Sequence, residues 1–229
     1  MGIVTIILGF LLSIAATSLK ERQEINVAID IKKNILRSLD FPESQDEPWT
    51  TESIQTMFDK NIVSYVVDAA GEKVDGMKVE DIDPLTQRDL SPVFCKKRKG
   101  KEIEGYAVPI AGKGLWSTLY GYIALESDGI TVKGITFYKH GETPGLGGEV
   151  EKEWFTQNFI GKRIIDEQSN LVGIQVVKGQ VDASSENAFH QVDGISGATM
   201  TTKGLNNFLM TDLQKYEPFF KRIRTKGNS

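Results

Sequence analysis

The stretch of residues 103–138, IEGYAVPIAGKGLWSTLYGYIALESDGITVKGITFY, decides the fold class. Three runs within it, at 103–109, 116–125 and 130–138, are rich in the β-branched and aromatic residues that favour strands. Gly129 marks the turn between the last two runs, because glycine adopts the backbone angles that tight turns need. The stretch therefore predicts neighbouring strands of one sheet.

Strands and helices predicted outside this stretch complete the domain. Further strand-like runs are predicted at residues 62–67, 93–97 and 171–177. Helices are predicted at residues 20–40, 51–58, 149–158 and 201–216, the second of them capped by Thr50 or Thr51. We therefore expect an α+β fold, with a mostly antiparallel β-sheet and flanking helices, over residues 61–229.

The first segment of the chain carries no charged side chain from Gly2 to Leu19. A helix of these residues would be about 27 Å long, close to the roughly 30 Å hydrocarbon core of a bilayer. We therefore predict a transmembrane anchor helix at residues 1–19 and juxtamembrane helices at 20–60. A cleavable signal peptide is the alternative, but it would need a basic leading region, and residues 15–18 form only a faint cleavage signal.

The composition excludes several classes of function. The net charge is −4 and basic residues are mixed with acidic ones, so we expect no concentrated basic face for nucleic acid. The chain has one cysteine, Cys95, and two histidines, His140 and His190. An internal disulfide is therefore impossible, and we predict no zinc, haem or other metal site. Cys95 is interpreted as a small apolar residue at the edge of a strand.

The residues of two segments are not those that a β-sheet core needs. Residues 141–148, GETPGLGG, form a glycine-rich loop that can bring backbone N–H groups close to a ligand. The loop lacks the Gly-x-Gly-x-x-Gly fingerprint of dinucleotide-binding folds, so no NADH site is predicted. Residues 193–202, DGISGATMTT, run into the last predicted helix, whose unpaired N–H groups and dipole favour a phosphate. The chemistry of these residues alone leaves two plainer interpretations possible. Residues 141–148 can be an ordinary turn, and residues 193–202 can be an ordinary helix cap.

Three motifs resemble those of one known family. The pattern Asp193-x-x-Ser196-Gly197-Ala198-Thr199 resembles the Asp-x-x-Ser/Thr-Gly-Ala-Thr motif of FMN-binding domains that a flavin transferase modifies. Residues 142–147, ETPGLG, resemble a second signature of that family, and residues 113–121, KGLWSTLYG, resemble a third. In this order, and with the predicted anchor, they make almost the whole chain similar to the C-type subunits (NqrC) of Na⁺-translocating NADH:quinone oxidoreductases.

That resemblance implies a covalently bound FMN. In the family the FMN phosphate is esterified to the last threonine of the motif, here Thr199, whereas Thr201 and Thr202 are rival hydroxyls that helix geometry does not exclude. Trp116 is expected near the flavin, on which an aromatic face can stack. No catalytic residue is expected, and the FMN-binding core is expected at about 103–214. The other expected cofactor-binding residues are Asp193, Ser196, Gly197, Ala198, Lys203, Glu142, Thr143, Gly145, Leu146 and Gly147.

The resemblance also implies a role in electron transfer. The chain is expected to be one redox subunit of a NADH:quinone (ubiquinone) reductase complex that exports Na⁺, and to be inactive alone. Its expected partners are the other subunits, the membrane and the flavin transferase that attaches FMN. The expected location is the bacterial inner membrane, with a single span and the soluble domain on the periplasmic side. The alternatives are the G-type FMN subunit of a ferredoxin:NAD⁺ oxidoreductase (Rnf-type) complex and a membrane-anchored binding module without a redox role.

Overall fold

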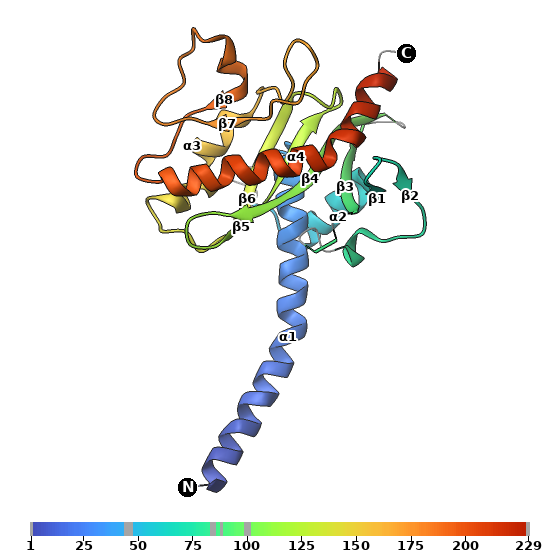
Figure 1. Ribbon diagram of the computed structural model, residues 1–229. Coiled ribbons are helices and arrows are strands. Elements are labelled where there is room, and N and C mark those ends of the chain that lie inside the picture. The colour runs from blue at the N-terminus through green and yellow to red at the C-terminus, as the bar shows by residue number, and fades with distance from the viewer. Residues whose placement is uncertain (1, 44–47, 83–85, 88, 99–101, 228–229) are drawn as a thin grey trace.

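The computed structural model describes the chain except residues 1, 44–47, 83–85, 88, 99–101 and 228–229. The described residues form a six-stranded sheet of order β2-β1-β3-β4-β5-β6, in which every neighbouring pair is antiparallel (Figure 1). The strands are β1 (Ile62–Asp68), β2 (Lys73–Val74), β3 (Leu90–Lys97), β4 (Ile103–Lys113), β5 (Thr118–Glu126) and β6 (Val132–Lys139). The predicted antiparallel sheet is therefore confirmed.

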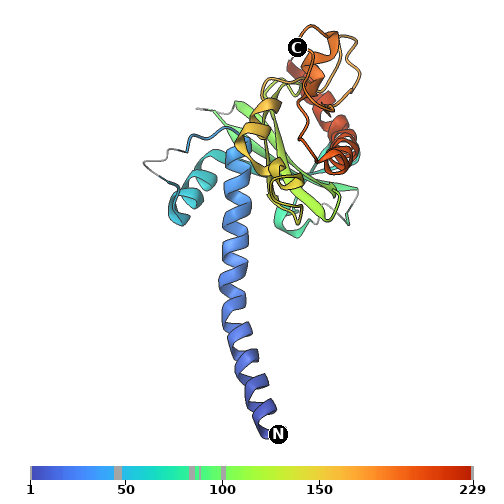
Figure 2. The ribbon, with the colours of Figure 1, turned by 90° about the vertical axis from the view of Figure 1, so that its left-hand side faces the viewer.

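Helices cover both faces of this sheet, as Figures 1 and 2 show. On one face, α1 (Gly2–Ser38) and α2 (Thr51–Asn61) pack over a cluster that includes Tyr122 and Ala124. On the other face, α4 (Thr199–Gly227) packs over a cluster that includes Ile123 and Leu125. These four consecutive residues of β5 alternate between the two clusters because successive side chains of a strand point to opposite faces. The sheet is thus buried on both sides.

The N-terminal cap of α2 follows local sequence. The Thr50 hydroxyl accepts a hydrogen bond from the Ser53 N–H at 3.1 Å, and the Ser53 hydroxyl accepts one from the Thr50 N–H at 2.8 Å. This reciprocal pair is a capping box, which satisfies N–H groups that have no partner within a helix. Of the two predicted caps, Thr50 is therefore the one used.

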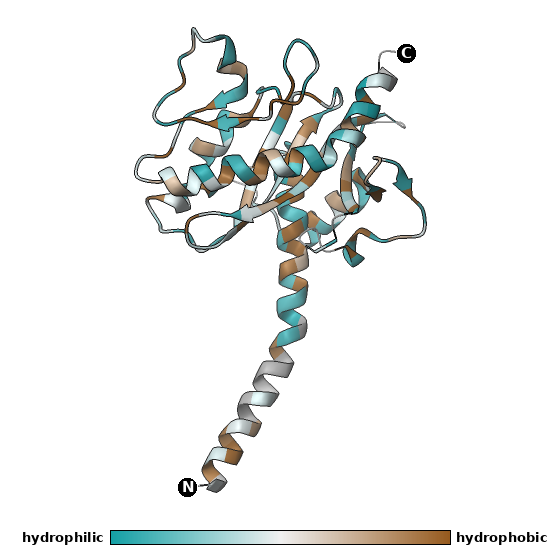
Figure 3. Cartoon of the chain, viewed as in Figure 1, coloured by the Kyte–Doolittle hydropathy of each residue, from teal (hydrophilic) through white to brown (hydrophobic). Residues whose placement is uncertain are grey.

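The last helix is longer than predicted. Instead of residues 201–216, α4 spans Thr199–Gly227 and continues through Pro218. A proline inside a helix costs about 3 kcal/mol. Burial of Tyr216, Phe219 and Phe220 offsets that cost, since each large side chain contributes roughly 1.5–3 kcal/mol when buried. Hydrophilic and hydrophobic residues alternate along α4 in Figure 3, as expected for a helix with one buried face.

Two predicted elements are wrong in extent. The predicted helix at 149–158 is three short pieces, η2 (Gly147–Glu151), α3 (Glu153–Thr156) and η3 (Gln157–Phe159), because Lys152 has an extended backbone with ψ 144°. The predicted strand at 171–177 shrinks to β7 (Gln175–Val176), which pairs in parallel with β8 (Gln191–Val192). Gly173 breaks it with a left-handed φ of 69°. Two further turns are η1 (Val79–Asp81) and η4 (Glu186–His190).

The N-terminal helix α1 extends away from the domain (Figure 2). It ends at Ser38, close to the end of the predicted helix at residue 40, and Asp40 has a φ of 56°. The side chains of residues 3, 11, 12 and 14–18, inside the predicted anchor, lie outside the described part of the chain. Among the described residues, no helix has both the length and the apolar character needed to span a bilayer, so the predicted anchor at 1–19 is not confirmed.

Candidate functional site

Glu142, at the start of the glycine-rich loop, is a buried carboxylate with an exposed fraction of 5 %. It accepts four hydrogen bonds, from the N–H groups of Leu115 (3.2 Å), Trp116 (2.9 Å) and Ser117 (3.0 Å) and from the Thr201 hydroxyl (2.7 Å). The motifs at residues 142–147 and 113–121 supply the carboxylate and the three N–H donors, and Thr201, two residues after the motif that ends at Thr199, supplies the hydroxyl. The motifs, which are far apart along the chain, therefore meet at one carboxylate.

The charge of Glu142 is stabilised by these donors. Burial alone would raise the pKa of the carboxyl, but the hydrogen bonds from Thr201 and from the three backbone N–H groups lower the pKa below its usual range. Glu142 is therefore an ionised structural anion at neutral pH. Its oxygens are occupied by the chain's own donors, so it holds the site together rather than facing a ligand.

Glycine at two positions leaves room for this carboxylate. A Cβ atom at Gly147 would lie 2.9 Å from Glu142 Oε2 and would overlap the Thr201 hydroxyl. A Cβ atom at Gly114 would lie 2.7 Å from Glu142 Oε1. Any larger residue at either position would displace the carboxylate, which explains the need for glycine in both loops.

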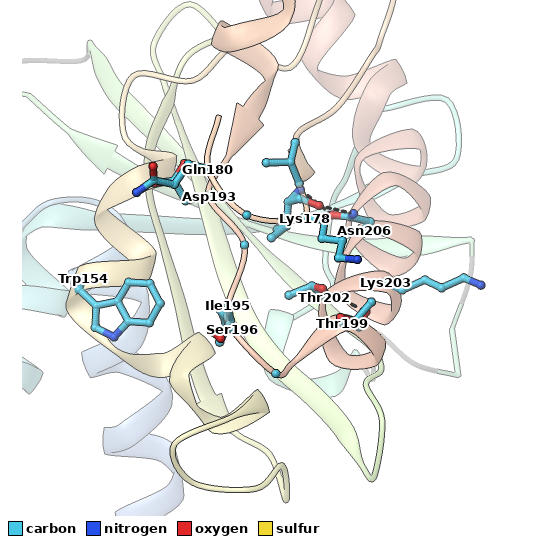
Figure 4. A pocket seen from close by; sticks show the side chains of 15 residues that line it. Trp154, Lys178, Gln180, Asp193, Ile195, Ser196, Thr199, Thr202, Lys203 and Asn206 are labelled. Atoms are coloured by element: carbon cyan, nitrogen blue, oxygen red, sulfur yellow. Dashed lines mark hydrogen bonds between the residues drawn. The ribbon is translucent and has the colours of Figure 1, made fainter. Parts of the chain in front are cut away.

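A cavity of about 750 Å³ opens beside this network, over the first turns of α4 (Figure 4). This volume is within the roughly 300–1,000 Å³ typical of small-molecule sites. Four parts of the chain line it: Trp154 of α3, the segment 176–180, the segment 193–197, and the first turns of α4 with Thr199, Thr202, Lys203 and Asn206. In Figure 4, Trp154 stands on one side of the cavity and the α4 residues on the other.

The walls of the cavity are fixed by polar side chains. Asp193 Oδ1 accepts a hydrogen bond of 2.7 Å from the Val181 N–H. Asn206 accepts one from the Val176 N–H (2.8 Å) and donates one to the Val176 carbonyl (2.9 Å). The segment 176–181 is thereby tied both to the threonine motif and to α4.

The three threonines at the start of α4 differ in accessibility. Thr201 is 1 % exposed and donates to Glu142. Thr202 is 8 % exposed, and its hydroxyl donates to the carbonyls of Ala198 (3.2 Å) and Thr199 (3.1 Å). Thr199 is exposed and lines the cavity, and its hydroxyl has no hydrogen-bond partner among the described residues. Of the three rival hydroxyls, that of Thr199 is the one on an exposed residue and without a hydrogen-bond partner among the described residues.

The same end of the cavity attracts anions. The first N–H groups of α4 have no carbonyl partner within the helix, and the positive end of the helix dipole lies there. Lys178 and Lys203 are exposed and line the cavity as well. A helix N-terminus with basic residues in its surroundings fits a phosphate, although the Lys203 side chain extends outward from α4 in Figure 4.

The structure places the predicted site residues in two groups. Asp193, Ser196, Gly197, Thr199 and Lys203 line the cavity, and Ala198 is buried directly behind them. The second group does not line the cavity: Glu142, Thr143, Gly145, Leu146, Gly147 and Trp116. It adjoins the first group, because Leu146 Cδ2 lies 2.7 Å from where a Cβ atom on Gly197 would sit.

Other lining residues carry no motif in the sequence. They are Trp154, Val176, Val177, Lys178, Gly179, Gln180 and Asn206. The sequence around residues 176–180 predicts the end of a strand, so nothing in it indicates a ligand-binding loop. Asn206 could have been found, because it lies seven residues after Thr199, which is the spacing of one helix face.

Comparison with known proteins defines the class. Residues 114–213 match the model of the FMN-binding domain family, and this span contains Glu142, the glycine-rich loop and the cavity residues. The crystal structure of the C subunit of the Na(+)-translocating NADH-quinone reductase from Parabacteroides distasonis is similar, with a TM-score of 0.76 and 32 % identity over 88 % of this chain and 96 % of that one. The crystal structure of Shewanella oneidensis NqrC has a TM-score of 0.71 and 26 % identity over 86 % of this chain and 97 % of that one.

Full-length relatives specify the family within that class. The C subunit of the Na(+)-translocating NADH-quinone reductase of Pseudomonas aeruginosa is 35 % identical, over 94 % of this chain and 90 % of that protein. The same subunit from Vibrio anguillarum is 34 % identical, over 97 % of this chain and 92 % of that protein. The chain belongs to the NqrC family, the C subunits of the Na⁺-translocating NADH-quinone reductase, which is an oxidoreductase complex.

Proposed function

We propose that the chain is an electron-transfer subunit of the Na⁺-translocating NADH:quinone reductase that carries FMN as a phosphoester on Thr199. The observation that carries the proposal is the accessible Thr199 hydroxyl at an electropositive end of a cavity of about 750 Å³. Family membership supports FMN as the cofactor. The resemblance of residues 193–199 to the flavinylation motif supports the covalent link.

Different residues of the chain hold different parts of the cofactor. The N–H groups at the start of α4, with Lys178 and Lys203, orient the phosphate. Leu146 of the glycine-rich loop lies against Gly197 of the cavity lining and gives the flavin an adjoining surface, and the family resemblance adds Thr143 of the same loop. Bound FMN supplies the redox chemistry, while the protein supplies its position and surroundings. The chain acts in this way as one member of the complex, together with the other subunits.

Attachment of the cofactor is a phosphoryl-type transfer from FAD. The Thr199 oxygen attacks the flavin-side phosphorus, the pyrophosphate P–O bond breaks, and AMP leaves with the bonding electron pair. The hydroxyl proton passes to a base of the flavin transferase, which acts with Mg²⁺. No oxidant or reductant is consumed. The exposure of Thr199 leaves its hydroxyl open to such an enzyme.

Mass measurement tests the attachment site. The chain is coexpressed with a flavin transferase, denatured and weighed intact, in wild-type form and as Thr199→Ala, Thr199→Ser and Thr202→Val. We expect an FMN-sized addition in the wild type, in Thr199→Ser, which keeps a hydroxyl, and in Thr202→Val. We expect none in Thr199→Ala. Persistence of the addition in Thr199→Ala would overturn the proposed site.

Membrane attachment is a second part of the proposal. It is supported by the uncharged run from Gly2 to Leu19, although the described helical residues do not provide a membrane-spanning helix. Extraction of host membranes with alkaline carbonate is the test: an anchored chain stays in the pellet. Protease added to spheroplasts then reports the side, and a periplasmic domain is digested without lysis. Release by carbonate would contradict the anchor.

The rival assignment to a ferredoxin:NAD⁺ oxidoreductase complex is not favoured by the relatives described above. Purification of the native complex distinguishes the two assignments. We expect this chain to co-purify with NADH:quinone reductase subunits and Na⁺-dependent quinone reduction. Ferredoxin-type iron–sulfur subunits as stable neighbours would instead support the rival.

A further inference from the structure

Trp154 is a half-exposed aromatic residue at the cavity, with an exposed fraction of 49 %. Its indole N–H donates a hydrogen bond of 3.0 Å to Glu149 Oε2. The only polar atom of the side chain is therefore satisfied by the protein itself. What Trp154 presents to the cavity is an apolar ring face, and such a face gains free energy when another flat apolar surface covers it.

Contacts with buried aromatic residues fix the position of the Trp154 ring. The ring packs edge-on against Phe155, with 5.8 Å between centroids and an interplanar angle of 72°. Phe155 is fully buried and packs in the same manner on Phe159, at 5.4 Å and 75°. The Glu149 hydrogen bond and these edge-on aromatic contacts together orient the indole, so that one ring face is presented to the cavity.

Trp154 lies on the side of the cavity opposite Thr199, as Figure 4 shows. A flavin whose phosphate is bonded to Thr199 must extend its ring system away from the start of α4, because the ribityl chain separates ring and phosphate. The remaining large apolar lining residues are aliphatic, namely Val176, Val177 and Ile195. Trp154 is the aromatic member of the cavity lining.

The other two tryptophans of the chain are placed differently. Trp116 is 67 % exposed and does not line the cavity, and its backbone N–H is bonded to Glu142. Trp49 packs with the cluster on the opposite face of the sheet, where its indole N–H donates to the Pro42 carbonyl at 3.1 Å. The resemblance implies Trp116 as the stacking residue, whereas the geometry favours Trp154.

We propose that Trp154 is the positioning surface against which the isoalloxazine ring of the tethered cofactor stacks, with Glu149 holding the indole in place. This inference rests on the proposed attachment of FMN to Thr199. It adds the residue that orients the ring system. Stacking is sensitive to spectroscopy, because an indole in van der Waals contact with an oxidised flavin quenches its fluorescence.

Flavin fluorescence of the loaded protein tests the inference. Wild type, Trp154→Leu, Trp154→Tyr, Trp116→Leu and the control Trp49→Phe are coexpressed with flavin transferase, and FMN content is measured by intact mass. Emission per bound flavin is then compared before and after denaturation. In the wild type we expect quenched emission that rises severalfold on denaturation. Trp154→Leu should show that rise already in the native state, and Trp154→Tyr, which keeps a stacking ring that also quenches, should not.

A second variant tests the inference even if Trp154→Leu does not fold. Glu149→Ala keeps the indole but removes its hydrogen bond, so native emission should rise partway and visible circular dichroism of the flavin should weaken. Native emission unchanged in a flavin-loaded Trp154→Leu, or raised in Trp116→Leu or Trp49→Phe instead, overturns the inference. Absence of the mass addition from the wild type would overturn the attachment itself, so the two failures are distinguishable.

Discussion

The Thr201 hydroxyl donates a hydrogen bond of 2.7 Å to Glu142 Oε2, and the two residues are 59 positions apart in the sequence. This contact joins the glycine-rich loop to the second residue after Thr199. Both side chains are buried, with exposed fractions of 1 % for Thr201 and 5 % for Glu142. The position of the proposed attachment hydroxyl therefore depends on a carboxylate that does not itself line the cavity.

Replacement of Glu142 tests this dependence. Glu142→Ala leaves the buried Thr201 hydroxyl and three partly buried backbone N–H groups without this acceptor, so we expect the free energy of unfolding to fall by about 2 kcal/mol. Guanidinium titration measures the change. Glu142→Gln keeps one acceptor oxygen and should lose less. An unchanged midpoint in Glu142→Ala would show that the network contributes nothing to stability.

Two glycines of the same loop form a matched pair. Gly145 has a φ of 75° and open space where a Cβ atom would stand, so Gly145→Ala should cost only the backbone strain of about 1 kcal/mol. Gly147→Ala should cost more, about 2–3 kcal/mol, because the methyl group meets Glu142 and Thr201. Thermal unfolding of both variants gives the order. The reverse order would contradict the crowded geometry at Gly147.

Much of the fold is predictable because its signals are local. Strand β4 and its neighbours follow from runs of β-branched and aromatic residues, and the start of α4 follows from a motif next to an amphipathic pattern. The extension of α4 through Pro218 is not predictable in this way. It depends on burial of Tyr216, Phe219 and Phe220 against the sheet, which is a tertiary effect.

The site is predictable in its motifs but not in its geometry. Motif resemblance brings forward Thr199 and Glu142, and the structure places Thr199 at the cavity and Glu142 beneath the loops. The sequence cannot distinguish Thr199 from Thr201, because only long-range hydrogen bonding separates a free hydroxyl from an occupied one. Likewise Trp154 gives no local signal, since its place at the cavity depends on how the broken helix after Lys152 packs on the sheet.

Cys95 should be chemically inert in the folded protein. The sequence favours a residue at a strand edge, but Cys95 is fully buried within β3, where it pairs with Val63 and Tyr106 on the neighbouring strands. Burial raises the pKa of its thiol to about 12, with a smaller opposite effect from the hydrogen bond to the Tyr65 hydroxyl. Because the thiolate is the reactive form, an aromatic disulfide reagent at pH 8 should modify Cys95 only after denaturant is added. Rapid modification of the native protein would contradict this burial.

Titration of the Asp212 carboxyl makes the free energy of unfolding depend on pH, in a direction that follows from the shift of its pKa. Burial raises the pKa of its carboxyl from 3.8 to about 6, although the Ala111 N–H, which donates to Oδ2 at 2.8 Å, and the charge of Lys215 act in the opposite direction. The folded protein thus binds this proton more tightly than the unfolded chain does. The stability that the group contributes is full below pH 3.8 and is lost as pH rises through about 6.

Asp212→Asn tests that sign, because an amide oxygen can still accept from Ala111 but carries no buried charge. At pH 8 the variant should be more stable than the wild type by about 2 kcal/mol, and the difference should shrink at pH 5, where the wild-type carboxyl is largely protonated. Urea titrations at both pH values measure it. Asp75→Asn, which removes an exposed carboxylate, is the matched control variant. Equal gains for Asp212→Asn at pH 5 and pH 8 would mean that the stabilisation comes from packing and not from the titrating charge.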